Sequence, residues 1–311
     1  MKGIDLSIAI VSYNTRDLTR RCLASIFDGN REITLDVCVV DNASTDGSAD
    51  LIEREFPRAR VIRNGENRGL AAATNQALAT GAGRYLAALN SDTIVQPGAL
   101  VRLVRFLDEH PAVGGATPRL IRPDGGKHPV FFGTAESPRW AILENLAGFS
   151  KRARLGVLAK RHGTIDLSRS QPVPCILCGT CFVVRREAYE QVGGQDPRFF
   201  IYGEDTDWSL RIWKAGWQQY YLADAEVVHF GGQSTKQVSA TMQAQEMKSR
   251  CRLIQKHFGF FAGYTLRLVI AAMCGIRLLK WVVQYPIRPP KSSARAVMKQ
   301  MLANIRAALT Y

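Results

Sequence analysis

Short β-rich runs alternate with helical patterns through the first half of the chain. Residues 6–13 (LSIAIVSY) read as a buried strand, and residues 17–27 repeat apolar side chains at helical spacing. The same alternation recurs further on, with strands expected at 35–40, 59–63 and 85–89 and helices at 48–55, 70–79 and from Pro97 onward. This order predicts an α/β fold around a mainly parallel sheet.

The second half is less regular. Little periodicity is visible between residues 119 and 170, which we interpret as a variable, ligand-facing region. Regular patterns return with strands expected at 180–184, 218–222 and 226–229 and helices at 186–191 and 206–215.

Polar side chains stand where the predicted strands end. Ser12 and Asn14 close the first strand, Asp41 follows the second, and Asn90-Ser91-Asp92 follow the fourth. Ligands bind at the carboxyl edge of open α/β sheets, so this edge is the candidate site. Asp41 is suited to accept hydrogen bonds from a ligand N–H or hydroxyl, and the alternative is that Asp41 and Asn42 only form a turn.

The charge of the chain is unevenly distributed. The 311 residues include 41 Lys and Arg against 27 Asp and Glu, a net charge of +14, which suggests nucleic acid, an anionic substrate or an anionic membrane as partner. From Lys236 to the end there are 13 basic residues and one acidic residue, Glu246. The body is therefore nearly neutral and has no basic groove of the kind that binds nucleic acid, so no nucleic-acid partner is expected.

Cysteine usage and the amino terminus indicate a location. The seven cysteines are odd in number and follow no disulfide framework, which favours a reducing compartment. The first five residues run straight into a strand pattern, which leaves no room for the apolar core of a signal peptide. We expect a cytoplasmic body.

Several motifs occur together and in a characteristic order: VSYN at 11–14, VVDNASTDGS at 39–48, NRG at 67–69, LNSD at 89–92, VGG at 192–194 leading to Asp207, and His229. In this combination the chain resembles family 2 glycosyltransferases with the GT-A fold, over roughly residues 6–234. The likeness is strongest to the bacterial rhamnosyltransferase branch, which builds cell-wall and surface polysaccharides.

This resemblance implies a nucleotide-sugar donor, with dTDP-rhamnose as the expected one, and a glycan or polyprenyl-diphosphate-linked acceptor. The residues expected at the donor are Ser12, Asn14, Asp41, Asn67, Arg68, Gly69, Asn90, Ser91 and Asp92. Arg68 precedes a helix amino terminus, where phosphate oxygens bind readily, although a solvated loop arginine is an equal alternative. The runner-up functions are a galactofuranosyl or other hexosyl transferase that uses a UDP-sugar, and a non-catalytic nucleotide-sugar-binding scaffold.

Most GT-A enzymes bind a divalent cation through a D-x-D motif. Asn90-Ser91-Asp92 occupies the matching positions here, so an amide replaces the first carboxylate. The resemblance implies Mg²⁺ or Mn²⁺ held by Asp92 and by His229, although a lone histidine is often only structural. Carbonyl oxygen, water and substrate phosphate also satisfy such hard cations.

Three carboxylates lie within four positions at Glu204, Asp205 and Asp207, just before a predicted helix. A helix amino terminus stabilises negative charge, and a general base must be ionised. The resemblance assigns the base of an inverting transfer to Asp205, and the alternative is a simple helix cap. By the same resemblance the residues expected at the acceptor are Gly179, Thr180, Tyr202, Glu204 and Asp207.

Cys175, Cys178 and Cys181 are spaced as in some metal sites, but no fourth ligand lies near, so ordinary packing is expected.

We divide the chain into a GT-A domain at 1–235 and a basic, helical region at 236–311. Residues 258–285 are rich in Phe, Leu, Ile and Val but interrupted by Arg267, Arg277 and Lys280, which is typical of a helix lying in an anionic membrane interface. Packing on the body is the alternative. No uninterrupted apolar run reaches about 18 residues, so a simple spanning helix is not expected. These features predict a peripheral protein at the inner face of the cell membrane.

Overall fold

The computed structural model describes residues 3–126, 138–147, 166–175, 179–231, 239–284 and 292–309. The chain divides into two compact units, each of which is described by itself. The first unit comprises residues 1–135, 165–200 and 204–234, and the second comprises 136–164, 201–203 and 235–311. The second unit thus includes a segment before residue 165 that the sequence analysis assigns to the first domain.

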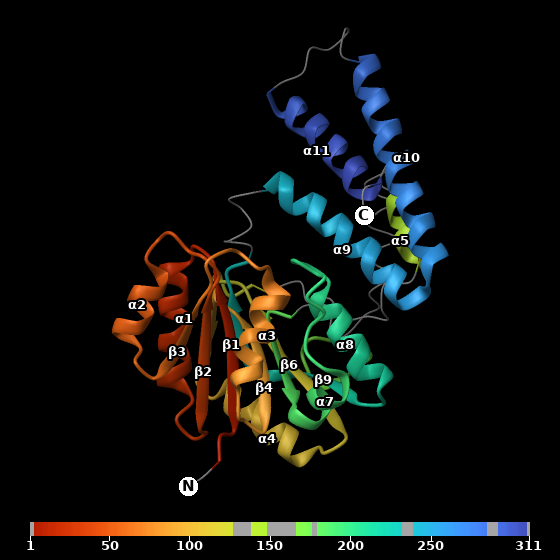
Figure 1. Ribbon diagram of the computed structural model, residues 1–311. Coiled ribbons are helices and arrows are strands. Elements are labelled where there is room, and N and C mark those ends of the chain that lie inside the picture. The colour runs from red at the N-terminus through yellow and green to blue at the C-terminus, as the bar shows by residue number, and fades with distance from the viewer. Residues whose placement is uncertain are drawn as a thin grey trace. The chain divides into compact units, whose positions relative to one another are not determined.

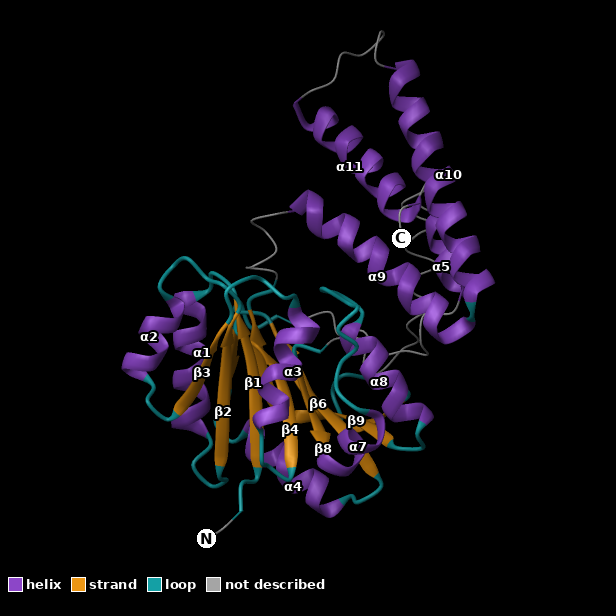
Figure 2. Ribbon diagram, in the orientation of Figure 1, coloured by secondary structure: helices purple, strands orange, loops and turns teal. Residues whose placement is uncertain are grey.

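The described residues of the first unit form one nine-stranded sheet (Figure 2). Its strands are β1 (Leu6–Ser12), β2 (Leu35–Asp41), β3 (Ala59–Arg63), β4 (Tyr85–Asn90), β5 (Thr93–Val95), β6 (Val113–Ile121), β7 (Gln171–Val173), β8 (Cys181–Arg185) and β9 (Gln218–His229). Their order is β3-β2-β1-β4-β8-β6-β9-β5, and β7 pairs with β9. β1 to β4 run parallel, β8 is antiparallel to both neighbours, and β6 and β9 are parallel to each other. The prediction of an α/β fold with a mainly parallel sheet is confirmed.

Helices cover both faces of this sheet, because the strands carry apolar side chains on both faces. On β1, Leu6, Ile8 and Ile10 belong to one hydrophobic core and Ala9 to another. The first core also takes side chains from α1 (Arg16–Gly29), α2 (Ser48–Glu55) and α4 (Ala99–Glu109). The second takes them from α3 (Leu70–Thr80), α7 (Arg186–Val192) and α8 (Glu204–Lys214) (Figure 1). The helices and strands predicted up to α4 are confirmed to within a few residues at each end.

Three differences from the predicted elements have physical causes. β6 escapes the sequence pattern because Gly114, Gly115 and Pro118 interrupt it, yet a Cβ on Gly115 would lie 2.5 Å from the ring of Phe182, so a close approach requires glycine there. The two strands expected at 218–229 are one strand, β9, whose register with β6 shifts after Pro118. β5 and β7 have three residues each, too few for any periodicity to show.

The described part of the second unit is helical. It contains α5 (Pro138–Ala147), α9 (Ser239–Phe258), α10 (Phe260–Gln284) and α11 (Ser292–Leu309). One side of α10 packs through Leu266, Ile270 and Cys274 into a small core shared with the other three helices. The expectation that the region after residue 235 is helical is confirmed for its described residues, which form α9, α10 and α11.

Candidate functional site

The polar strand ends meet at the carboxyl edge of the sheet. Ser12 at the end of β1 is in register with Asp41 at the end of β2, and Val11 is in register with Asn90 at the end of β4. β9 runs in the same direction and ends at His229. The edge predicted to bind a ligand therefore gathers hydroxyl, amide, carboxylate and imidazole groups.

Ser12 lies within a buried cluster of hydroxyl groups. Its Oγ is 3.2 Å from Thr15 Oγ1 and 3.1 Å from Thr19 Oγ1. Thr15 Oγ1 in turn lies 3.1 Å from Ser91 Oγ, in the turn between β4 and β5. Ser12 is fully buried, so its hydroxyl connects two strand ends rather than facing solvent.

Asp41 has one satisfied carboxylate oxygen and one free oxygen. Oδ1 accepts a hydrogen bond from Ser44 N at 2.9 Å, whereas buried Oδ2 accepts none from the described residues. Asn14, at φ 52°, holds the adjoining loop: its N–H donates to Ser44 Oγ, and its Oδ1 accepts from Thr45 N. An unpartnered buried acceptor is costly, and a ligand N–H or hydroxyl would satisfy Oδ2.

Asn42, which the sequence analysis treats only as part of a turn, organises the donor loop. Its Nδ2 donates to Asn67 Oδ1 at 2.9 Å, and its Oδ1 accepts from Arg68 N at 3.1 Å and Asn64 Nδ2 at 3.0 Å. The Arg68 guanidinium is exposed and has no side-chain partner within the described ranges. The signal that points to Asn42 is its place directly after Asp41 at a strand end.

Gly69 allows the loop to approach the chain before α8. It has φ 82°, and a Cβ there would lie 2.6 Å from the carbonyl oxygen of Phe200. The next residue, Leu70, donates its N–H to that same oxygen at 2.6 Å. A side chain at position 69 would therefore disrupt this junction between α3 and the segment that precedes α8.

Asp92 and His229 converge as the resemblance implies. Asp92 Oδ1 lies 3.3 Å from His229 Nε2, and both residues are buried. His229 Nδ1 is 3.4 Å from Thr180 Oγ1, and the tautomer that donates from Nδ1 leaves the Nε2 lone pair directed toward Asp92. No group of three or more His, Cys, Asp or Glu side chains suited to a metal occurs in the ranges described. A carboxylate oxygen with an imidazole nitrogen suits a divalent cation whose other ligands are phosphate oxygen and water.

The three carboxylates in the first turn of α8 have different environments. Glu204 and Asp207 are buried, at 4% and 0% exposure, whereas Asp205 keeps part of its surface accessible. Asp205 Oδ2 accepts from Gly179 N at 2.7 Å, and Oδ1 accepts from Thr206 N at 2.6 Å. Of the three, Asp205 alone is both fixed and accessible to a ligand.

Burial opposes ionisation of the first two carboxylates of α8. It raises the pKa of Asp205, although hydrogen bonds from Gly179 and Thr206 pull this pKa back down. It also raises the pKa of Glu204 well above its ordinary value, and the neighbouring Asp205 charge adds to this rise. Glu204 Oε2 has no hydrogen-bond partner in the described structure. Glu204 is therefore suited to remain protonated beside an ionised Asp205.

Asp207 lies in a structural ion pair. Its Oδ2 accepts from Arg211 Nε at 2.9 Å, one turn further along α8. Arg211 also donates to the carbonyl oxygens of Val192 and Gly194. The pair thus fixes the loop that precedes α8, and the contact of Glu204 and Asp207 with an acceptor stays a prediction.

Two further predictions concern residues outside this cluster. Tyr202 belongs to the second unit and adopts φ 68°, an uncommon conformation for a tyrosine. Cys178 lies outside the described residues, while Cys175 and Cys181 are buried, and burial raises the pKa of each thiol to about 12. Neutral buried thiols fit the expected packing role.

A line of short contacts joins the parts of the site. Asp205 is bonded to the backbone of Gly179, its neighbour Thr180 contacts His229, and His229 contacts Asp92. In addition, Asn90 N donates to the carbonyl oxygen of Thr180 at 2.9 Å. The candidate base, at the start of α8, and the candidate cation ligands therefore lie at the same edge of the sheet.

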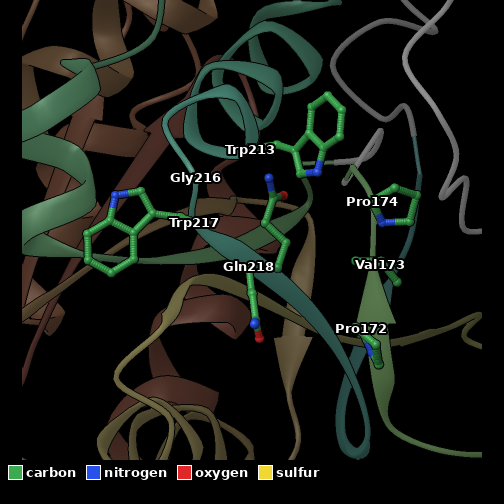
Figure 3. Close-up of a pocket in the computed structure, with 8 residues that line it drawn as sticks. Pro172, Val173, Pro174, Trp213, Gly216, Trp217 and Gln218 are labelled. Carbon is green, nitrogen blue, oxygen red and sulfur yellow. The ribbon is translucent and has the colours of Figure 1, made fainter.

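A separate hollow of about 580 Å³ lies at the other end of α8 (Figure 3). Trp213 and Trp217 line it together with Pro172 and Pro174, and no charged side chain contributes. It contains none of the predicted site residues.

Fold and site together define an α/β enzyme with its reactive groups on the carboxyl edge of the sheet. The model of glycosyl transferase family 2 matches residues 7–193, more than half of the chain. The N-acetylglucosaminyl-diphospho-decaprenol L-rhamnosyltransferase of Mycobacterium tuberculosis is 31% identical over 277 residues, which cover 84% of this chain and 89% of that protein. The chain belongs to glycosyltransferase family 2, as the motifs predict, and is similar to a rhamnosyltransferase.

Solved structures agree on the fold. The mannosyltransferase PcManGT of Pyrobaculum calidifontis, in complex with GDP-Man and Mn²⁺, matches with a TM-score of 0.55 and 17% identity, covering 100% of this chain and 88% of its own. GalNAc-T7 with UDP, GalNAc and Mn²⁺ matches with a TM-score of 0.57 and 19% identity, covering 73% of this chain and 43% of its own. At this identity the likeness concerns the fold alone, and it confirms the GT-A assignment.

Proposed function

We propose that this chain is an inverting glycosyltransferase that moves a sugar from a nucleoside diphosphate to a hydroxyl group of a glycan or lipid-linked acceptor. The observation that carries the proposal is the position of Asp205, which is fixed, partly exposed and linked through Gly179 and Thr180 to the Asp92–His229 pair. Family membership supports the transferase class.

Rhamnose from dTDP-rhamnose is the donor we expect. The Mycobacterium tuberculosis relative is named as an L-rhamnosyltransferase that acts on N-acetylglucosaminyl-diphospho-decaprenol, and the similarity covers most of both chains. Such an acceptor places the reaction in the synthesis of cell-wall or surface polysaccharide. A UDP-linked galactofuranose or other hexose is the runner-up donor.

The donor would lie along the carboxyl edge of the sheet. Asp41 Oδ2 is the buried acceptor that a pyrimidine N–H or a ribose hydroxyl would reach. Asp92 and His229 would hold Mg²⁺ or Mn²⁺, which when bound neutralises charge on the diphosphate. The exposed guanidinium of Arg68 adds a positive group next to the amino terminus of α3.

Asp205 would act on the acceptor. Its carboxylate takes the proton of the attacking hydroxyl while the acceptor oxygen forms a bond to the anomeric carbon. The bond from that carbon to the diphosphate oxygen breaks in the same step, so the nucleoside diphosphate departs and the configuration inverts. Hydrogen bonds from Gly179 and Thr206 hold the carboxylate in one orientation through this step.

The test is a turnover assay of nucleoside diphosphate release with dTDP-rhamnose, UDP-galactofuranose and UDP-glucose, with Mg²⁺ or Mn²⁺, and a polyprenyl-diphosphate-linked N-acetylglucosamine acceptor. We expect turnover with dTDP-rhamnose and a kcat that falls ~10²–10⁴-fold in Asp205→Asn with little change in donor Kd. The exposed Asp17→Asn is the matched control.

Three outcomes would contradict parts of this proposal. Turnover retained in Asp205→Asn would remove the base assignment. Preference for a UDP-sugar would favour the runner-up donor. Donor binding without turnover for any pair of substrates would favour a nucleotide-sugar-binding scaffold.

A further inference from the structure

The outer face of α10 is an uncovered apolar stripe. Its large side chains keep much of their surface exposed: Phe261 83%, Tyr264 49%, Leu268 47%, Ile276 52% and Leu279 63%. They recur at helical spacing on one side, and Thr265 and Ala272, which are also exposed, complete that side without a charge. The stripe runs over 18 residues, a length of ~27 Å.

The opposite face of α10 is also apolar, but it is covered. Leu266, Ile270 and Cys274 are buried against Cys251 and Ile254 of α9, with α5 and α11 contributing to the same core. The exposed stripe is thus a second apolar face, additional to the one that the helices of this unit already bury. A continuous exposed stripe of this size marks a surface with a partner.

Length and composition alone would let α10 cross a bilayer. The segment Phe260–Lys280 is long and apolar enough by these two criteria, so the expectation that no helix spans the membrane stays a prediction. However, α9 and α10 are joined by a tight turn at Gly259 and pack against each other on either side of it. α9 carries Lys248, Arg250, Arg252 and Lys256, so a crossing α10 would draw charged groups into hydrocarbon.

Charge identifies the chemistry of the partner. The chain from Lys236 onward holds 13 basic residues and one acidic residue. Lys280 is exposed and follows the last residue of the stripe, Leu279. Apolar insertion together with surrounding positive charge is the combination that binds an anionic lipid surface, at about 1 kcal/mol for each basic group near the headgroups.

We propose that the outer face of α10 lies flat in the interface of a membrane that contains anionic lipid, with the stripe from Phe261 to Leu279 inserted at one shallow depth. This surface would hold the enzyme peripherally at the inner face of the cell membrane, beside a lipid-linked acceptor. The inference rests on α10 and its charge, and does not depend on which sugar the enzyme transfers.

The first test is flotation of the full-length protein with vesicles. We expect strong binding when about a third of the lipid is phosphatidylglycerol and weaker binding to pure phosphatidylcholine, with partial loss of binding in high salt. The variant Leu268→Asp/Leu279→Asp should bind anionic vesicles at least tenfold more weakly. Because both side chains are exposed, circular dichroism and the melting temperature should stay as in the wild type.

The matched control for each single substitution, Leu268→Asp or Leu279→Asp, is Trp213→Asp, which adds the same single negative charge at a half-exposed apolar residue of the first unit. It should bind vesicles as the wild type does. An equal loss of vesicle binding in this control would contradict the proposal, because net charge and not the stripe would then govern binding. Unchanged vesicle binding of the Leu268/Leu279 variant would also overturn the proposal. A dimer in solution that the same variant dissociates would show instead that a second copy covers the stripe.

The second test separates a helix that lies flat from one that spans. A fluorophore attached in turn to Phe261→Cys, Leu268→Cys and Leu279→Cys should be quenched by nitroxide lipids at the same shallow depth. The native cysteines among the described residues are buried, which limits background labelling. A deep position at Leu268→Cys between two shallow end positions would show a spanning helix and overturn the flat orientation. Both tests measure binding only, so their failure is distinguishable from a failure of the proposed catalysis.

Discussion

The free oxygen of Asp41 lowers the stability of the folded protein in the absence of a ligand. Oδ2 is buried without a hydrogen-bond donor in the described structure, while Oδ1 is satisfied by Ser44. A buried acceptor left unsatisfied costs ~1–3 kcal/mol, so the residue is better suited to binding than to stability.

Asp41→Asn tests whether Asp41 serves ligand binding rather than folding stability. The amide can keep the bond from Ser44 but presents N–H groups where an acceptor stood, so we expect the donor Kd to rise ~10-fold or more with no loss of folding stability. Isothermal titration with the nucleoside diphosphate and thermal melting measure the two quantities. Asp46→Asn is a useful comparison, because Asp46 accepts bonds from Ser48 and Arg16 and its replacement should lower stability instead.

Glu204 predicts a pH dependence of stability. Its pKa is raised well above the ordinary value of 4.5 by burial, so the folded protein keeps a proton that the unfolded chain has lost. The free energy of unfolding then falls as pH rises above this value, by at most ~1.4 kcal/mol per pH unit. In Glu204→Gln this loss should disappear, so the variant gains stability relative to wild type between pH 5 and pH 8.

Urea unfolding of both proteins across this pH range measures the difference. The control is Glu66→Gln, which removes an exposed carboxylate. Its free energy of unfolding should change with pH in the same way as that of the wild type. If the free energy of unfolding of Glu204→Gln also changes with pH as it does in the wild type, Glu204 is ionised in the folded protein.

At the level of elements, the first turn of α8 combines the proposed base, Asp205, with a structural group, Asp207. Asp205 faces the site, while Asp207 on the same turn is fully buried and paired with Arg211. Breaking a buried ion pair leaves an uncompensated charge, so Asp207→Asn should lower stability by ~3–5 kcal/mol. Chemical denaturation measures this change.

The exposed pair Glu32–Arg105 supplies the control for that prediction. Its side chains are 65% and 63% exposed, and Glu32→Gln should cost only ~0–1 kcal/mol. If Glu32→Gln and Asp207→Asn lower the free energy of unfolding equally, the Asp207–Arg211 pair has no special structural role.

Some strands of the sheet can be predicted from the sequence alone and others cannot. Strands with long apolar runs and polar ends, such as β1 and β2, are predictable because burial on both faces requires such runs. β6 is not predictable in this way, because its glycines are required by residues distant in sequence: Gly115 by Phe182, which is 67 positions away, and Gly114 by Trp217. Likewise, the role of Asn42 depends on Asn64, Asn67 and Arg68, which only the fold brings together.

For the whole molecule, the uneven charge has a functional meaning. The first 235 residues are nearly neutral, and the net positive charge lies in the helical region after them. Salt should therefore affect membrane binding far more than chemistry at Asp205. Composition alone shows the total charge, whereas the exposed apolar face of α10 suggests the membrane surface at which we propose that this charge acts.

The reversed strand β8 has a consequence for how the protein is made. β3, β2, β1 and β4 emerge early from the ribosome, but the free edge of β4 is covered by β8, about 90 residues later in the chain. Until then the nascent sheet presents an unpaired edge, a template for pairing with another chain. Slow translation or truncation between residues 90 and 181 should therefore favour aggregation, and chaperone capture should peak in that window.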